Sequence, residues 1–186
     1  MREVMIDFET LGTVADAVIL SIGAVKFNID TGQIDDDGFY ASISVDSNLA
    51  AGRRIQEDTL IWWMDQNAKA QNVFKEAKQD LLPALQEFHA WFDPDLIKEY
   101  KVWSNGADFD IPMIQHAWRT HGIESPWQFW NSRCFRTYKS LPHAKQAISV
   151  PNPGKHNALM DALTQAKQLI EIHKVVVASA KGKVKV

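Results

Sequence analysis

The amino-acid sequence predicts an α/β fold in which helices flank a mixed five-stranded sheet. Three strand-like segments come first along the chain, followed by a helical region and two strand–helix pairs, an order typical of such a sheet. The first strand-like segment is apolar on both faces, which favours a sheet covered by helices. With 186 residues, 46% of them hydrophobic, the chain is long enough for one compact domain. We expect a single domain over residues 1–178 and a basic, flexible tail over residues 179–186.

The first three strands are expected to form an antiparallel meander. Residues 3–9 (EVMIDFE) make the central strand, and residues 17–28 (AVILSIGAVKFN) make the second. The turn-rich segment DTGQIDDDG follows, and residues 39–45 (FYASISV) make the third strand. We interpret the acidic residues 35–37 within this turn as a hydrated hairpin loop.

A helical pattern then replaces the strand pattern. One helical region with a buried stripe is predicted from residue 57 to residue 93, and the chain returns to a strand at residues 100–106. The stripe consists of apolar residues that recur at spacings of three and four: Leu81, Leu82, Leu85, Phe88 and Phe92.

The remaining elements complete the sheet and its cover. A helix is expected at residues 109–121, because Pro112 is tolerated in a first turn and Gly122 suits a helix end. Residues 132–138 (SRCFRTY) are predicted to make the fifth strand. The last helix begins near Asn157 and carries an ordinary apolar stripe.

Composition excludes several classes of protein. The net charge is −3, so any attraction for nucleic acid has to be local rather than spread over a basic surface. Cys134 is the only cysteine, which rules out an intrachain disulfide and argues against a cysteine-based zinc site. The N-terminal segment MREVMIDFET lacks the apolar stretch of a signal peptide or a membrane span, so we expect a cytoplasmic protein without membrane contact.

Two acidic residues lie at the end of the first strand. Asp7 and Glu9 are two positions apart, so their side chains project from the same face of the sheet. Such a pair, when shielded from water, either raises a carboxyl pKa or binds a cation, and Mg²⁺ and Mn²⁺ prefer oxygen ligands. Acidic pairs at strand ends are also common in a solvated form, so the pair by itself is a weak signal.

A second acidic pair, Asp108 and Asp110, lies between a predicted strand and a predicted helix. Aspartate at this place often caps a helix. Ligands in open α/β sheets bind beyond the carboxyl ends of the strands, where Asp110 would lie beside the acids of the first strand. We therefore expect Asp110 to be the ligand and Asp108 to be the cap.

His156 and Asp161 lie at the start of the last helix. If Asn157 caps this helix, Asp161 is about one turn inside it and off its apolar face, while His156 is in the preceding loop. Each residue considered by itself has an ordinary interpretation: His156 as a surface histidine, and Asp161 as an aspartate that interacts favourably with the helix dipole. Taken together, both side chains are able to face one cleft.

In combination, these motifs resemble those of a known family. DFET, NGADFD and HNALMD match in order and spacing the three exonuclease motifs of the DEDDh group, and the resemblance covers nearly the whole chain. The chain is most similar to the compact branch that contains phage exonuclease A and mycobacterial exoribonucleases, on the segments SIGAVKF, DTLIWWMDQ and PWQFWNSRCFRT. The resemblance implies a ribonuclease H-like fold.

The resemblance also assigns the site. Asp7, Glu9, Asp110 and Asp161 match the four metal-binding acids of the family, and His156 matches its general base. Many relatives space the asparagine and aspartate of the second motif one residue closer, which makes Asp108 a competitor, but Asp110 directly follows Phe109 as the FD pair requires. The implied reaction uses two divalent cations, Mg²⁺ or Mn²⁺, and releases nucleoside 5′-monophosphates from a 3′ end.

Aromatic residues are candidates for stacking against single-stranded substrate. We expect Phe109 and Trp63 to contact the bases, although one of the neighbouring Trp62 and Trp63 should be buried, because side chains adjacent on a helix point about 100° apart. Thr10 and Leu11 are also expected at the substrate. Arg133 and Arg136 are weaker candidates for phosphate contacts.

The leading hypothesis is thus a metal-dependent 3′–5′ exonuclease acting on single-stranded DNA or RNA ends. DNA is favoured over RNA only through the likeness to phage exonucleases. A 3′–5′ exoribonuclease, an endonuclease of the ribonuclease H type and a non-catalytic nucleic-acid-binding module are the alternatives. Exposed aromatic residues would also suit a homodimer interface.

Overall fold

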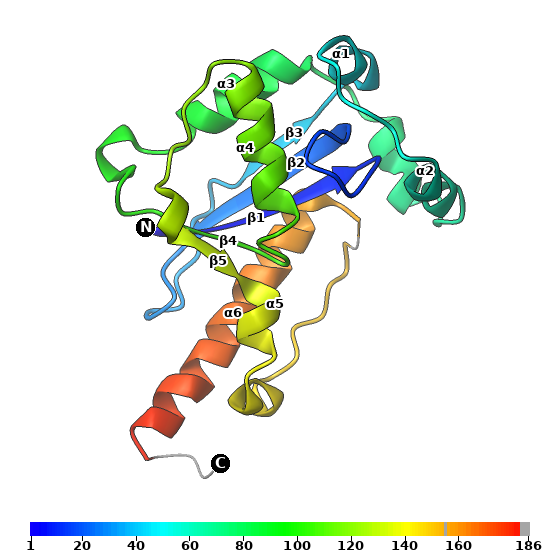
Figure 1. The fold of residues 1–186 in the computed structure, drawn as a ribbon. Coiled ribbons are helices and arrows are strands. Elements are labelled where there is room, and N and C mark those ends of the chain that lie inside the picture. Colours follow the sequence, from blue (N-terminus) through cyan, green and yellow to red (C-terminus); the bar gives the residue numbers. More distant parts are fainter. Residues whose placement is uncertain (155, 183–186) are drawn as a thin grey trace.

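The computed structural model describes residues 1–154 and 156–182 of the chain (Figure 1). Within these residues, five strands form one mixed sheet in the order β3-β2-β1-β4-β5, which confirms the predicted fold class. β2 is antiparallel to both β1 and β3, whereas β4 is parallel to β1 and to β5. The strands are β1 (Glu3–Thr10), β2 (Ile19–Phe27), β3 (Phe39–Ser42), β4 (Lys101–Ser104) and β5 (Ser132–Cys134).

Helices cover both faces of this sheet. In Figure 1, α3 and α4 lie on one face, and α5 and the long α6 lie on the other. The α-helices are α1 (Val45–Ala50), α2 (Glu57–Met64), α3 (Leu81–Ala90), α4 (Asp110–Thr120), α5 (Phe135–Lys139) and α6 (Ala158–Ala180). The short 3₁₀ helices are η1 (Ala70–Phe74), η2 (Pro94–Leu96), η3 (Phe129–Asn131) and η4 (Pro142–Gln146).

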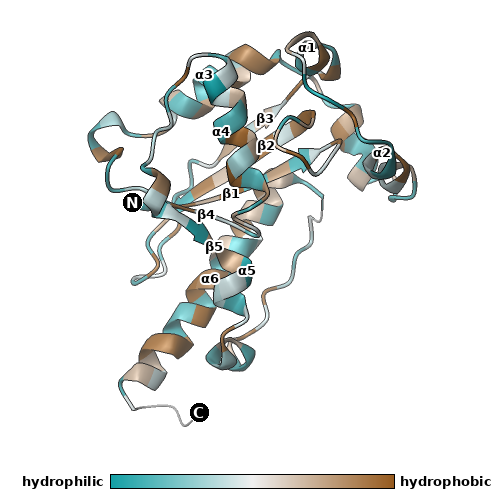
Figure 2. Ribbon diagram, in the orientation of Figure 1, coloured by the Kyte–Doolittle hydropathy of each residue, from teal (hydrophilic) through white to brown (hydrophobic). Residues whose placement is uncertain are grey.

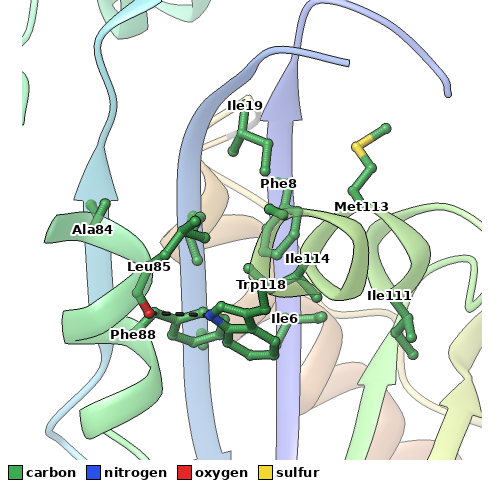
Figure 3. Packing of buried hydrophobic residues seen from close by; sticks show 14 of the residues in the cluster. Ile6, Phe8, Ile19, Ala84, Leu85, Phe88, Ile111, Met113, Ile114 and Trp118 are labelled. Carbon is green, nitrogen blue, oxygen red and sulfur yellow. Dashed lines mark hydrogen bonds between the residues drawn. The ribbon is translucent and has the colours of Figure 1, made fainter. Parts of the chain in front are cut away.

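The larger core lies between the sheet and the pair α3 and α4. Ile6 and Phe8 of β1 pack there with Trp118 of α4 (Figure 3). The Trp118 indole nitrogen donates a hydrogen bond to the Leu85 carbonyl oxygen of α3, at 3.2 Å, so this buried polar group is satisfied. Alternate residues of β1 thus face the two helices, as the period of a strand requires.

The opposite face of the sheet packs against α6. Met5 of β1 and Val25 of β2 are buried against an apolar stripe of this helix, which Figure 2 shows as brown bands along α6. A Cβ atom on Gly23 would lie 2.1 Å from the Ala158 carbonyl carbon, so only glycine lets the start of α6 come this close to β2. Because successive side chains of β1 point to opposite faces of the sheet, Asp7 and Glu9 lie on the same face as Met5, the face that α6 covers.

The helical region at residues 57–93 is broken, which corrects the prediction of one continuous region. α2 ends at Met64, and α3 begins only at Leu81. The chain between them forms η1, whose Ala70 and Val73 are buried in the same core cluster as Trp63 of α2. The Asn67 side chain accepts hydrogen bonds from the backbone of Lys69 and Ala70, at 3.0 and 3.1 Å, and so starts a separate turn.

The predicted third and fifth strands are longer than those observed. β3 ends at Ser42, and Ser44 caps α1, a helix that the sequence pattern did not indicate. β5 ends at Cys134 because the chain turns into α5, where Phe135 is buried in the α6-side core. The backbone nitrogen of Arg136 bonds to the Asn105 carbonyl oxygen instead of extending the ladder, at 2.9 Å.

Both ends of α4 and the start of α6 agree with the expected signals. Pro112 is in the first turn of α4, and Gly122 follows its end with a φ of 71°. α6 continues to Ala180, so it includes the first residues of the segment expected to be a tail, and Lys183 and Lys185 lie outside the described residues. Among residues 1–154 and 156–182, none of the helices combines the length and hydrophobicity that a transmembrane span requires.

Candidate active site

The end of β1 positions the first two carboxylates. Asp7 and Glu9 share the α6 face of the sheet, while Phe8 between them is buried in the opposite core. The pairing of β1 with β2 shifts register between Glu9 and Thr10, an irregularity of the kind that re-aims side chains beside active sites. Glu9 is only 8% exposed, so its carboxylate is largely removed from water.

The start of α6 brings Asp161 to the same place. The Asn157 side chain accepts a hydrogen bond from the backbone nitrogen of Met160 at 3.1 Å, which confirms it as the helix cap. Asp161 is then in the first turn of the helix. One carboxylate oxygen from each of Asp7, Glu9 and Asp161 lies within 4.8 Å of the others.

Asp110 is the fourth acid and the first residue of α4. Its side chain is 3% exposed and accepts a hydrogen bond from the backbone nitrogen of Phe8 at 3.1 Å, which fixes it beside β1. Asp108 is exposed and does not cap α4, contrary to the expectation, because the residue at the cap position is Phe109, with no side-chain hydrogen bond.

The four carboxyl groups have pKa values above the ordinary range. Burial, reinforced by the charges of Asp161 and Asp110, raises the pKa of Glu9 to about 8. Burial raises the pKa of Asp110 to about 7. The pKa of Asp7 is raised well above its usual value by burial and by the other three carboxylates.

Asp161 is less perturbed, and hydrogen bonds explain why. Burial raises its pKa, whereas hydrogen bonds from Asn152 and from the His156 backbone lower it. The Asn152 amide donates to Asp161 Oδ1, and the His156 backbone nitrogen donates to Oδ2 at 2.8 Å. Both carboxylate oxygens are therefore oriented before any ligand arrives.

His156 is held in an unusual backbone conformation. Its φ is 64°, in the left-handed region that a residue with a side chain seldom adopts and that occurs at functional sites. Its ring meets the Trp62 ring edge to face at a centroid distance of 5.2 Å, and the Trp63 ring at 6.0 Å. The imidazole thus packs against α2, while the backbone nitrogen of His156 bonds to Asp161.

A pocket of about 390 Å³ opens beside the carboxylates. Its lining comes from the end of β1, the following loop, α2 and the residue before α4: Phe8, Glu9, Thr10, Gly12, Thr13, Asp58, Thr59, Trp62, Trp63 and Phe109. A pocket that joins apolar walls to a few charged groups is the usual form of a ligand site.

The expected substrate residues take different places around this pocket. Thr10, Phe109 and Trp63 line it, but Trp63 is only 2% exposed, and its indole nitrogen donates to the Thr10 carbonyl oxygen at 2.8 Å. Trp62 is the more accessible tryptophan, at 44% exposure. Leu11, at 2% exposure, is packed in a core cluster and is not among the lining residues.

Sequence reasoning missed two residues that orient the acids. Gln165 of α6 donates its side-chain amide to Asp7 Oδ1 at 2.7 Å. Its position, four residues after Asp161, was a usable signal, because residues at this spacing lie on one face of a helix. Asn152 had no such signal, since the loop between η4 and α6 has no period.

The residues present fit divalent cations. Oxygen ligands alone, held close together with raised pKa values, suit Mg²⁺ or Mn²⁺ and offer no soft donor for other metals. The Gln165 side-chain oxygen is buried and has no hydrogen-bond partner among the described residues, which leaves one polar atom beside Asp7 unsatisfied. A bound cation with its water molecules would balance the charge of the carboxylates and could supply a hydrogen-bond donor to the Gln165 side-chain oxygen.

Comparison with solved structures identifies the fold. The chain resembles Escherichia coli exonuclease I in complex with a dA16 oligonucleotide, with a TM-score of 0.66, 10% identity, and coverage of 95% of this chain and 43% of that chain. An exonuclease I from Methylocaldum szegediense matches with a TM-score of 0.65, 14% identity, and coverage of 95% and 42%. At such identities the likeness concerns the ribonuclease H-like fold, and the chain spans less than half the length of these proteins.

Comparison of sequences identifies the family. An exodeoxyribonuclease of Enterobacteria phage T4 is 24% identical over 159 residues, covering 74% of this chain and 70% of the relative. The model of the 3′-5′ exoribonuclease Rv2179c-like domain matches residues 2–173, a stretch that includes all four carboxylates and His156. Since this match extends over far more than half of the chain, the protein belongs to the 3′-5′ exoribonuclease Rv2179c-like domain family.

Proposed function

We propose that the protein is a metal-dependent 3′–5′ exonuclease that removes nucleoside 5′-monophosphates from single-stranded 3′ ends, with DNA favoured over RNA. One observation carries the proposal: oxygens of Asp7, Glu9 and Asp161 lie within 4.8 Å of one another, with Asp110 and His156 beside them. Family membership and the relatives named above support the same reaction class.

Asp7, Glu9, Asp110 and Asp161 would hold the cations. When bound, two divalent cations lower the pKa of a water molecule and stabilise negative charge on the departing 3′ oxygen. Zinc-bound and metal-free forms of the Escherichia coli exonuclease I complex with single-stranded DNA are known. Gln165 keeps Asp7 in place, and Asn152 keeps Asp161 in place.

His156 would act as the general base. An imidazole nitrogen can accept the proton of the attacking water, which is the usual role of histidine in general base catalysis. Its backbone bond to Asp161 holds it next to the proposed cation ligands, and the rings of Trp62 and Trp63 limit its rotation. The proton taken from water thus has a fixed acceptor.

The pocket beside Glu9 would take the 3′-terminal nucleotide. Phe109 and the tryptophans of α2 supply apolar walls for a base, independent of its sequence. Thr10 lines the pocket, and the Thr10 hydroxyl donates to the Gly12 carbonyl oxygen at 2.8 Å, which shapes the loop at its edge. Leu11 would not contact the nucleotide but would hold this loop in place by packing in the core.

The choice between DNA and RNA rests on the relatives. The phage T4 exodeoxyribonuclease and the oligonucleotide complexes of exonuclease I favour DNA. The name of the family favours RNA, which makes a 3′–5′ exoribonuclease the second candidate. A homodimer and a cytoplasmic location are further proposals that come from the sequence alone.

The test compares matched DNA and RNA oligonucleotides, labelled at the 5′ end, with Mg²⁺ and then with Mn²⁺. We expect a ladder of products shortened from the 3′ end, with faster decay of DNA, and no cleavage by an Asp7→Asn variant. Faster decay of RNA would establish the second candidate. Cutting of a circular substrate would indicate a ribonuclease H-type endonuclease, and binding without any cleavage would indicate a non-catalytic module.

A further inference from the structure

Arg136 lies beside the loop that leads to Asp110. It is the second residue of α5, and its backbone nitrogen bonds to the Asn105 carbonyl oxygen at 2.9 Å. A Cβ atom on Gly106 would lie 2.9 Å from Asp108 Oδ1, 3.1 Å from Arg136 Nη2 and 3.4 Å from Arg136 Cζ, so both the Asp108 carboxylate and the guanidinium rest against this glycine. Glycine at this position therefore leaves room for the arginine head group.

The guanidinium of Arg136 is unused by the protein. The residue is exposed, and within residues 1–154 and 156–182 its side chain forms neither an ion pair nor a hydrogen bond. Arg133, three residues earlier, differs: its Nη1 donates to the carbonyl oxygens of Trp130 and Ser132, at 2.7 and 3.0 Å. One arginine of the pair is thus structural, and the other is free to bind a ligand.

The charge of Arg136 acts on one of the four carboxylates. Burial dominates the raised pKa of Asp110, and the charge of Arg136 partly lowers it. The charge of His156 acts in the same direction on Asp161. A basic group at the rim of an acidic site lowers the repulsion that a phosphate chain would meet there.

The order of the strands indicates the direction in which a bound single strand would cross the sheet. The terminal-nucleotide pocket lies toward β2, because Trp63 of α2 packs in the same cluster as Leu20 of β2. Asp7 and Glu9 are on β1, in the middle of the sheet, and Arg136 follows β5, which is at the edge of the sheet away from β2 and β3. A strand with its 3′ end in the pocket and its last phosphodiester at the carboxylates would continue toward α5 (Figure 1).

We propose that Arg136 binds the phosphate one nucleotide to the 5′ side of the scissile bond. This inference rests on the proposed function, and it makes Arg136 a substrate-binding residue that determines how the single strand leaves the site. The planar guanidinium donates paired hydrogen bonds to phosphate oxygens, a geometry that lysine lacks. The contact exists before and during the reaction, so it should act on KM rather than on kcat.

The first experiment measures kcat and KM of Arg136→Ala, with Arg133→Ala as the matched control and a single-stranded oligonucleotide as substrate. For Arg136→Ala, KM should rise about tenfold, the scale of one charge-assisted hydrogen bond, and kcat should stay within about twofold. The slope of log KM against log salt concentration should fall by about 0.7, as for one lost phosphate contact on a single strand. Arg136→Lys should recover only part of the loss, and Arg133→Ala should match the wild type.

The second experiment keeps the wild-type protein and changes the substrate. An uncharged methylphosphonate replaces the linkage one nucleotide to the 5′ side of the scissile bond, and in a control it replaces a linkage five nucleotides further away. KM should rise about tenfold for the first substrate only, and Arg136→Ala should add nothing to this increase.

Three results would overturn the inference: an unchanged KM for Arg136→Ala, a loss confined to kcat, or a defect of the variant that persists on the uncharged linkage. A wild-type protein that releases no mononucleotide would instead refute the proposed function, and the inference with it.

Discussion

At the scale of single residues, two aspartates of one loop have opposite surroundings. Asp110 is buried and bonded to the Phe8 backbone, whereas Asp108 is exposed. The sequence motifs favoured Asp110, which directly follows Phe109, and left Asp108 as a competitor. Burial beside Asp7 is the feature that distinguishes them.

This difference predicts unequal effects of two matched substitutions. Asp110→Asn should lower kcat by about 100-fold or more, because it removes the negative charge and one of the two oxygens of a proposed cation ligand, and such a cation contributes several kcal/mol of transition-state stabilisation. It should also raise the melting temperature of the metal-free protein at pH 8, since the buried group, with a pKa of about 7, no longer ionises there. Asp108→Asn should change neither; equal losses in the two variants would contradict the assignment.

His156 provides the second prediction at this scale. His156→Ala should lower kcat by about 100-fold or more, the usual contribution of general base catalysis, and leave Mn²⁺ affinity nearly unchanged in a calorimetric titration. His89→Ala on α3 is the control, since that imidazole packs on Trp118, away from the carboxylates. A fully active His156→Ala variant would remove the base from the proposed mechanism.

At the scale of elements, the site depends on how closely α6 approaches β2. Both Asp161 and the His156 loop are carried by the start of this helix, and Gly23 is the position at which the two elements meet. The helix cap determines where α6 begins, and the apolar stripe determines which side of it faces the sheet. The backbone contact at Gly23 determines the distance between the start of α6 and β2. The distance from Asp161 to Asp7 therefore depends on one residue of β2.

Gly23→Ala should consequently disturb both stability and activity. The added methyl group would meet the Ala158 and Leu159 backbone at 2.1–2.4 Å, so we expect a loss of about 3 kcal/mol in the free energy of unfolding, the upper range for overpacking. Gly52→Ala is the control: nothing lies within 4 Å of its Cβ, and its φ of 79° makes the cost about 1 kcal/mol of strain. Urea titration gives both values, and a similar cost for the two would argue against the close approach.

At the scale of the whole molecule, the carboxylates connect stability to pH and to cations. A carboxyl group whose pKa is higher in the folded than in the unfolded state binds more protons when folded. The free energy of unfolding then falls as the pH rises from the unfolded pKa, about 4, to the folded pKa. For Glu9, with a folded pKa of about 8, this window runs from about pH 4 to pH 8.

The metal-free protein should therefore have a lower melting temperature at pH 8 than at pH 5. Added Mn²⁺ should raise the melting temperature more at pH 8, because the cation binds the ionised form and replaces the lost protons. Glu9→Gln should flatten the pH dependence, since its amide does not titrate. Differential scanning calorimetry with a chelator and with Mn²⁺ measures all three, and a melting temperature that rises from pH 5 to pH 8 without metal would contradict the sign.

The sequence by itself determined the sheet class, the ends of α4, the start of α6, and the face of the sheet on which Asp7 and Glu9 lie. These features depend on local rules: the period of two along β1 puts Asp7 and Glu9 on one face, and the Asn157 cap sets Asp161 one turn into its helix. Each rule needs only neighbouring residues, so the printed sequence suffices to apply it.

The tertiary structure alone decided which side chains complete the site and which are buried. No local period along the chain predicts the hydrogen bonds of Gln165 to Asp7 and of Asn152 to Asp161. The same holds for the packing of Arg136 against Gly106 and for the burial of Trp63. The break between α2 and α3 belongs to the same class, because Ala70 and Val73 of η1 join the core cluster of Trp63 through contacts across the fold. Contacts across the fold depend on packing in three dimensions, which the order of residues does not state.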